Sequence, residues 1–248
     1  MRISYAKPEL AYDIRICLTS VMKRGRKPTI DAADITRAAI AIADAEGLAA
    51  VSMARVAAEM GNATMALYRH VKSKDELLAL MWDSAMEQPP PLPDGDWRDQ
   101  LGFWAKAVLT AIRRRPWFLQ IPISGPPAGP KNLAWLDSAL SALEGLPLEP
   151  GEKIGVVMGL STFVQGEARL NFTLAKGFEE DPARFNHQYG QMLREVVDPR
   201  RMPSLAKVVD AGVFDMDDVL DVEDIGADFD FGLHLFLEGV AAHIRGRS

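Results

Sequence analysis

Residues 61–74 read GNATMALYRHVKSK, and this stretch decides the predicted fold of the 248-residue chain. Its glycine can leave a helix in a left-handed conformation, from which a following helix crosses the first at a steep angle. The stretch contains no carboxylate, although the whole chain carries a net charge of −6. It gathers four basic or ionisable side chains, Arg69, His70, Lys72 and Lys74. A basic stretch of this kind in an acidic protein predicts contact with a polyanion.

Apolar residues three or four positions apart predict helices on both sides of this stretch. One helix ends at Gly47, a second covers residues 52–60, and a short third helix ends near Val71. Ser73 and Glu76 then form a capping box that begins a longer helix. The succession of helix, turn and helix is typical of a motif whose second helix enters the major groove of DNA.

Two motifs resemble those of a known family. Residues 52–61, SMARVAAEMG, and residues 67–78, LYRHVKSKDELL, are similar to the DNA-binding domain of tetracycline-repressor (TetR) type regulators, over about residues 30–86. Asn62 departs from the pattern, because the family usually has a buried valine there. More loosely, three later segments resemble the tetracycline-repressor-like C-terminal domain: residues 97–98, 115–117 and 229–239. The resemblance implies a homodimer with about nine or ten helices in each subunit, whose body binds a small molecule and releases DNA.

The resemblance assigns the DNA contacts to the short helix and its surroundings. Thr64 can hydrogen-bond a base edge, and Met65 or Ala66 can touch a thymine methyl group. Arg69 can reach guanine or a phosphate, and Lys74 is expected to anchor a phosphate. The expected DNA-binding residues are Lys23, Arg24, Arg26, Lys27, Ser52, Arg55, Thr64, Met65, Ala66, Tyr68, Arg69, His70 and Lys74. Plainer interpretations stay open, with Tyr68 as a packing aromatic, Arg55 as a solvated charge and His70 as a structural residue.

The charge is unevenly distributed along the chain. Residues 23–74 hold nine Lys or Arg against five Asp or Glu, a net charge of +4, so the acidic excess lies elsewhere. Residues 1–28 are expected to form a flexible basic extension, whose cluster at 23–27 lies on phosphate or in the minor groove. A plain tail is the alternative. Family members often begin near this cluster, so Met22 is a second possible start and residues 1–21 are then an added extension.

The acidic body is expected to bind a small molecule between its helices. Cavities of this kind are lined mostly by apolar and aromatic groups with a few polar ones, although aromatic residues at helical spacing are also common in cores. Gln165 and Asn171 interrupt an otherwise apolar helix at about 152–175 and can orient a ligand. The expected ligand-binding residues are Trp104, Trp117, Phe118, Trp135, Met158, Phe163, Gln165, Asn171 and Phe172.

Two stripes predict a dimer interface. The helix at 152–175 carries a ridge of small residues, Gly155, Gly159, Thr162 and Gly166. A glycine inside a helix costs about 1 kcal/mol relative to alanine, and close approach of another helix offsets that cost. The last helix carries a bulky stripe, Phe229, Leu233, Phe236, Val240 and Ile244. Two such helices from each subunit can form a four-helix bundle, and burial of both stripes within one subunit is the alternative.

The sequence thus predicts an all-α protein with an extension at 1–28, a helix-turn-helix DNA-binding domain at 29–86 and a ligand-binding and dimerisation domain at 87–248. A single cysteine and the lack of a long apolar run indicate a cytoplasmic protein. The chain has no H-E-x-x-H, C-x-x-C or phosphate-binding glycine loop, so neither enzymatic activity, nor a metal, nor a cofactor is expected. The predicted function is a ligand-responsive repressor that binds a palindromic operator as a homodimer. A helical small-molecule carrier without DNA function is the alternative.

Overall fold

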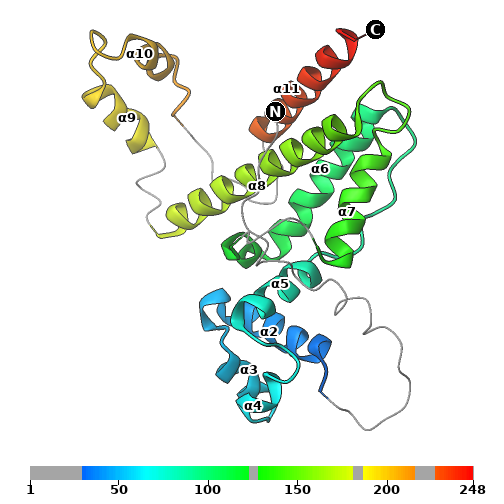
Figure 1. Ribbon diagram of the computed structural model, residues 1–248. Coiled ribbons are helices and arrows are strands. Elements are labelled where there is room, and N and C mark those ends of the chain that lie inside the picture. The colour runs from blue at the N-terminus through cyan, green and yellow to red at the C-terminus, as the bar shows by residue number, and fades with distance from the viewer. Residues whose placement is uncertain (1–29, 123–127, 181–186, 216–226, 248) are drawn as a thin grey trace. The chain divides into compact units, whose positions relative to one another are not determined.

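The computed structural model describes residues 30–122, 128–180, 187–215 and 227–247. All regular structure in these ranges is helical, with ten α-helices and two short 3-10 helices (Figure 1). The predicted all-α class is therefore confirmed. No helix in the same ranges combines the length and the apolar character that a membrane crossing requires. The chain divides into two compact units within α8 (Pro150–Glu180), between Met158 and Gly159. The domain boundary expected at 86/87 stays a prediction.

The helix-turn-helix module, residues 30–86, is built from helices that start on strong local signals. The side chain of Asp31 caps the first helix, and the hydroxyl groups of Ser52 and Ser73 cap two others. Each such cap contributes about 1 kcal/mol of stability. In chain order the elements are α2 (Ala32–Glu46), η2 (Leu48–Ala50), α3 (Met53–Glu59), α4 (Thr64–Leu67) and α5 (Lys74–Ala85).

The turn before α4 forms as the sequence predicts, but the helix after it is shorter. Gly61 has a φ of 64°, in the left-handed region that favours glycine. We expected a helix reaching Val71, whereas α4 ends at Leu67 and residues 68–70 form a turn. The backbone N–H of His70 donates to the carbonyl of Leu67, three residues earlier, so this turn is tighter than a turn of α-helix. This turn brings Val71 into the core, where it is as fully buried as Leu67.

Three further elements complete the first compact unit. They are α6 (Trp97–Arg114), η3 (Pro116–Gln120) and α7 (Pro130–Ser141), and the same unit includes the start of α8, up to Met158. Asp96 caps α6 by accepting the N–H groups of Arg98 and Asp99. The indole N–H of Trp104 on α6 donates to the carbonyl of Trp135 on α7 at 3.0 Å, and the two rings meet edge to face. This pair fixes α6 against α7.

Glycines and phenylalanines interlock two helices of the second unit, α8 and α11 (Ala227–Arg245). A Cβ atom on Gly159 of α8 would lie 3.2 Å from the ring of Phe236 on α11. In return, a Cβ atom on Gly232 of α11 would lie 2.8 Å from the ring of Phe163 on α8. Phe163 also stacks on Phe229, with ring centroids 5.4 Å apart. The predicted packing of small against large residues therefore occurs inside one chain.

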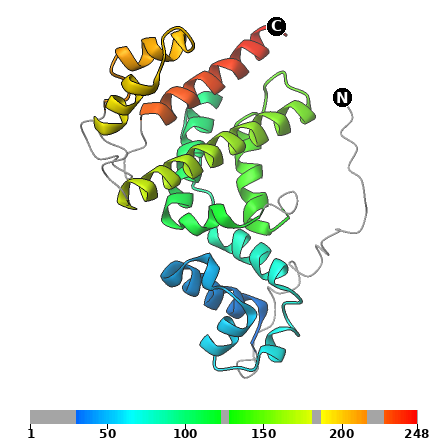
Figure 2. The same cartoon turned by 90° about the vertical axis from the view of Figure 1, so that its left-hand side faces the viewer.

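The segment at 178–228, where no helices could be assigned from the sequence, contains two short helices that pack together. α9 (His187–Val196) and α10 (Pro203–Asp210) lie side by side, coloured yellow and orange in Figure 2. They share an apolar core made of Leu193, Val197, Ala206 and Val209. The guanidinium of Arg194 on α9 forms an ion pair with the carboxylate of Asp215, which follows α10. This contact raises the pKa of Arg194.

Candidate nucleic-acid interface

The surface formed by α4, the turn after it and the first residue of α5 is exposed and basic. Two buried residues, Leu67 and Val71, anchor this segment to the core. Between and beside them the side chains point outward, with Met65 71% exposed and Tyr68 42% exposed. Arg69, His70, Lys72 and Lys74 are exposed as well. Thr64 and Ala66 are half-buried on the same short helix. The structure therefore brings together the central residues of the predicted DNA contact; we call residues 64–74 the basic surface.

The turn that presents this surface is closed by Asn62. The side-chain amide of Asn62 donates to the carbonyl of Met60 at 2.7 Å, and its backbone N–H donates to the carbonyl of Ala57 at 2.8 Å. An asparagine in a turn commonly satisfies the backbone in this way. The departure from the expected valine thus places a hydrogen-bonding side chain, not a gap, between α3 and α4.

Other cations of the helix-turn-helix module are already neutralised. Arg55 bonds the carboxylates of Glu59 and Glu46, each at 2.7 Å, and these bonds raise the pKa of Arg55. Arg37 pairs with Asp34 one turn earlier on α2. By contrast, within the described part of the chain the charged groups of Arg69, Lys72 and Lys74 form no hydrogen bond or ion pair, and only the backbone N–H of Lys72 donates to a carboxylate, that of Glu76. The free positive charge of the module is thus concentrated on the basic surface.

Two further groups of predicted DNA contacts are not among residues 64–74. The hydroxyl group of Ser52 accepts the N–H of Arg55 and serves as the cap of α3. The basic cluster made of Lys23, Arg24, Arg26 and Lys27 lies outside the described residues.

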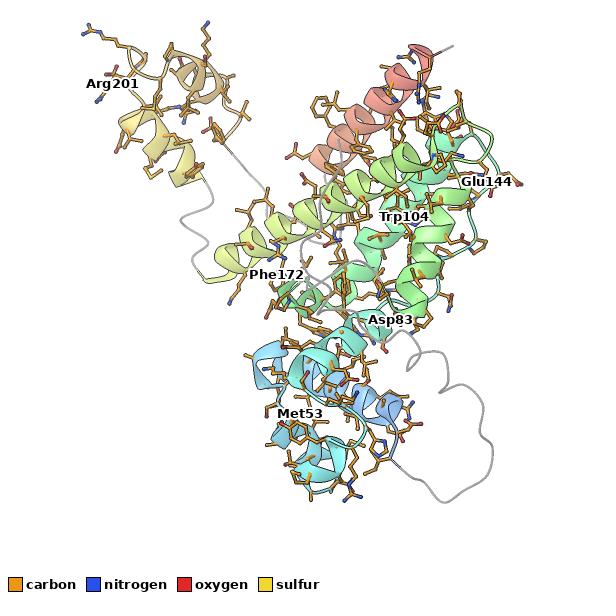
Figure 3. All side chains as sticks on the ribbon, in the orientation of Figure 1. Met53, Asp83, Trp104, Glu144, Phe172 and Arg201 are labelled. Atoms are coloured by element: carbon orange, nitrogen blue, oxygen red, sulfur yellow. The ribbon has the colours of Figure 1, made fainter. Side chains whose placement is uncertain are left out.

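A buried carboxylate joins the helix-turn-helix module to α7, as labelled in Figure 3. One oxygen of Asp83 on α5 accepts the backbone N–H groups of Lys131 and Asn132, at 3.0 and 2.9 Å, and the side-chain amide of Asn132. α7 has no side-chain cap of its own. Residue 129 must be glycine, because a Cβ atom there would lie 2.1 Å from the carboxyl carbon of Asp83. Sequence periodicity gave no sign of this contact, since the two partners are 48 residues apart.

The expected ligand-binding residues fall into three environments. Trp104, Trp117 and Trp135 are buried, and each indole N–H already donates to a protein oxygen. Phe118 is buried and packs on Trp82, and Phe163 packs on Phe229. Met158 is 42% exposed, whereas a last group is half-buried: Gln165, Asn171 and Phe172. In the described residues, no three His, Cys, Asp or Glu side chains are grouped so that they can hold a metal ion.

The two predicted dimer stripes are also divided by the structure. Phe229, Leu233 and Val240 are buried inside the chain, and Phe236 and Ile244 are half-buried. Gly159 is covered by Phe236, as described above. The remaining small residues of α8, Gly155, Thr162 and Gly166, are exposed. In the single chain the bulky stripe is thus buried or half-buried and most of the small ridge is exposed, and the predicted dimer interface stays a prediction.

Family models match both sequence modules. Residues 35–81 match the model described as bacterial regulatory proteins, tetR family, and residues 89–244 match the tetracyclin repressor-like C-terminal domain. The chain belongs to the tetR family. The second match alone covers more than half of the chain, so the family assignment extends beyond the DNA-binding module.

Relatives of this tetR-family protein agree in sequence and in fold. The HTH-type transcriptional repressor DrrR1 of Streptomyces coeruleorubidus is 36% identical over 234 residues, which cover 91% of this chain and 83% of that protein. Apo ActR of Streptomyces coelicolor is 25% identical, with a TM-score of 0.72 over 90% of this chain and all of ActR. ActR in complex with actinorhodin gives a TM-score of 0.71 at 25% identity, over 87% of this chain and 98% of ActR. The predicted family, fold and function as a DNA-binding transcriptional repressor are confirmed.

Proposed function

We propose that this tetR-family protein binds a palindromic operator as a homodimer and that a small organic molecule releases it. One observation carries the proposal. Within a single module, Arg37 and Arg55 are paired with carboxylates, whereas Arg69, Lys72 and Lys74 are exposed and unpaired beside an exposed tyrosine. Unpaired cations on one exposed surface attract phosphates, because binding DNA does not require them to break an ion pair.

The basic surface divides into parts that read bases and parts that hold the backbone. Thr64, Met65 and Ala66 stand on α4, the helix that enters the major groove, and contact base edges. Arg69, beyond the end of α4, reaches guanine or a phosphate, and Tyr68 and His70 flank it. Lys74, the first residue of α5, binds a phosphate that the positive end of that helix also attracts. Arg55 contacts a phosphate only if it gives up a carboxylate partner.

The homodimer forms through the outward faces of α8 and α11. Two large apolar residues of α11 are exposed in the single chain, Phe231 at 64% and Leu235 at 55%. On α8 the exposed positions include Thr162, Gly166 and Leu170, with Leu170 53% exposed. Exposed apolar and small residues on long helices favour close packing against a second copy. Two copies then place two basic surfaces about one DNA turn, ~34 Å, apart.

The effector binds among the helices of the C-terminal domain. ActR, which is similar over nearly its whole length, was crystallised with actinorhodin, an organic molecule. In this chain, Gln165, Asn171 and Phe172 are half-buried on α8, and their polar and aromatic groups are available to a ligand. The protein acts in the cytoplasm, where the operator DNA lies, and it carries out no catalysis.

Operator binding tests the proposal directly. The wild-type protein selects duplexes from a random DNA pool, and the selected sequence is expected to be an inverted repeat. Fluorescence anisotropy on that duplex is expected to show an affinity that falls steeply with salt, because phosphate contacts release counterions. Actinorhodin serves as the first effector probe and is expected to weaken binding. Selection of no repeat, together with binding that salt does not change, would contradict the proposal and favour a carrier.

A further inference from the structure

The corner between α6 and η3 holds the helix-turn-helix module at two points. Trp117 on η3 donates its indole N–H to the carboxylate of Asp44 on α2 at 2.6 Å. Arg115, the residue that ends α6, lies 3.3 Å from the same carboxylate. The guanidinium of Arg115 also donates to the carbonyl of Ala85 at the end of α5, at 3.1 Å. One corner of the body therefore contacts both the first helix and the last helix of the module.

Asp44 does not stabilise its own helix. It lies in the last turn of α2, which contains no basic residue, and a carboxylate there is disfavoured by the helix dipole. The other acid in this turn, Glu46, binds Arg55 and so ties α2 to α3 within the module. Asp44 instead reaches Trp117 and Arg115, both outside the module. The position of this carboxylate is thus explained by the contact with the body.

The two attachments of the module differ in what they restrain. Asp83 and Ala85 fasten the C-terminal end of α5 to α7 and to Arg115. These contacts, and the packing of Trp82 on Phe118, all lie on α5, close to the axis of that helix, so they resist rotation of the module about it only through a short lever arm. The attachment at Asp44 lies on a different helix, farther from that axis, and therefore resists the same rotation more strongly.

We propose that Asp44 is a positioning residue that fixes the rotation of the helix-turn-helix module about α5, and so sets the half-site spacing that the dimer accepts. The inference rests on the proposed function, since spacing has a meaning only for a homodimer on a palindrome. Asp44 itself touches no DNA. The contact with Trp117 and Arg115 keeps each basic surface in one orientation, so that both copies meet their grooves at one separation.

Spacing preference is the property that separates positioning from simple stability. The probes are duplexes that carry the inverted repeat selected by the wild-type protein, at its own spacing and with two base pairs added or removed. A fourth duplex carries a single half-site. A module that rotates freely loses affinity for the original spacing, gains relative affinity for the altered ones, and keeps its affinity for the half-site.

The main variant is Asp44→Ala, with Asp137→Ala on the exposed face of α7 as a control for the lost charge. Asp44→Ala is expected to bind the original duplex about tenfold more weakly. This loss is expected even though the removal of a negative charge by itself strengthens binding to DNA. Its preference for the original spacing is expected to fall by a similar factor. Asp44→Asn keeps an acceptor for the Trp117 N–H and is expected to recover part of both losses. Asp137→Ala is expected to behave as the wild type.

A second variant protects the test against misfolding. Trp117→Phe removes the indole N–H and keeps an aromatic ring in the core; a loss of about threefold in spacing preference is expected. An unchanged spacing preference in folded Asp44→Ala and Trp117→Phe would overturn the inference. An equal loss on the half-site duplex would also overturn it, because Asp44 would then act only on the module's own fold. Failure of the wild type to select any repeat would instead contradict the proposed function, and the inference with it.

Discussion

Two outward surfaces of this protein, the basic surface at residues 64–74 and the outer faces of α8 and α11, differ in every property that selects a partner. The basic surface lies on a four-residue helix and a turn, and it carries cations without carboxylates. The outer faces of α8 and α11 lie on long helices and expose Phe231, Leu235 and Leu170. The first surface suits a charged, hydrated partner, whereas the second suits the dry face of another helix. Both surfaces lie on helices, so the helical backbone does not determine the partner. The exposed side chains determine it.

The largest effect is expected from charging the apolar surface. Phe231→Glu combined with Leu235→Glu places two carboxylates at the proposed interface and is expected to weaken the dimer at least about 100-fold. Analytical ultracentrifugation measures the change. Phe103→Glu, on an exposed phenylalanine of α6, is the matched control and is expected to leave the dimer intact. A double variant that stays dimeric would place the interface elsewhere.

Loss of the buried Asp83 carboxylate is expected to lower the free energy of unfolding substantially. Asp83→Ala leaves the backbone N–H groups of Lys131 and Asn132 without their acceptor in a buried site. The expected cost is about 2–3 kcal/mol of unfolding free energy, measured by urea denaturation. Asp137→Ala, an exposed carboxylate on α7, is expected to change stability by less than about 0.5 kcal/mol. Equal costs for the two variants would show that Asp83 does not cap α7.

Removal of one unpaired cation is expected to weaken operator binding, and removal of a paired one is not. Arg69→Ala is expected to lower operator affinity about 10- to 100-fold and to reduce the salt slope by about one. Arg37→Ala removes a cation that is already paired with Asp34 and is expected to stay within about threefold of the wild type. Anisotropy titrations at several salt concentrations give both quantities. Similar losses for the two variants would mean that pairing does not distinguish these arginines.

The smallest effect is expected at Gly166, and its sign is informative. A Cβ atom on Gly166 would have no neighbour within 4 Å among the described residues. Gly166→Ala is therefore expected to stabilise α8 by about 1 kcal/mol through the higher helix propensity of alanine. In the monomeric background of Phe231→Glu and Leu235→Glu, the substitution is therefore expected to raise the unfolding free energy. In the dimer the added methyl group approaches the partner helix and is expected to weaken association a few-fold. Stabilisation in both backgrounds would exclude Gly166 from the interface.

Local signals allowed the helix-turn-helix module to be predicted from the sequence. Caps at Ser52 and Ser73 and the turn at Gly61 involve residues within a few positions of each other, so their pattern is visible in a short window. The same holds for the basic side chains, whose exposure follows from the burial of Leu67 and Val71 between them. The length of α4 was overestimated, because propensity does not show that the core draws Val71 inward through a turn.

Contacts between residues far apart in the sequence could not be predicted. Periodicity identified the stripe of α11 and the ridge of α8, but it does not state whether a partner helix belongs to the same chain. Within the single chain, Gly159 packs against Phe236, and the predicted dimer interface stays a prediction. The bond from Asp83 to α7 and the contact of Asp44 with Trp117 join residues 48 and 73 positions apart. Neither contact has a local pattern, and the second uses the indole N–H of Trp117, a residue that was predicted to line the ligand site.

The borrowed cap of α7 has a consequence for the order in which the protein folds. α7 starts at a proline preceded by a glycine, and the acceptor for its first N–H groups belongs to α5. During synthesis α5 leaves the ribosome first. The carboxylate of Asp83 then has no partner until residues 131 and 132 emerge. A fragment that starts at Trp97 would lack Asp83, and the first N–H groups of α7 would then have no acceptor from α5. The C-terminal domain therefore depends on the DNA-binding end for its own completion.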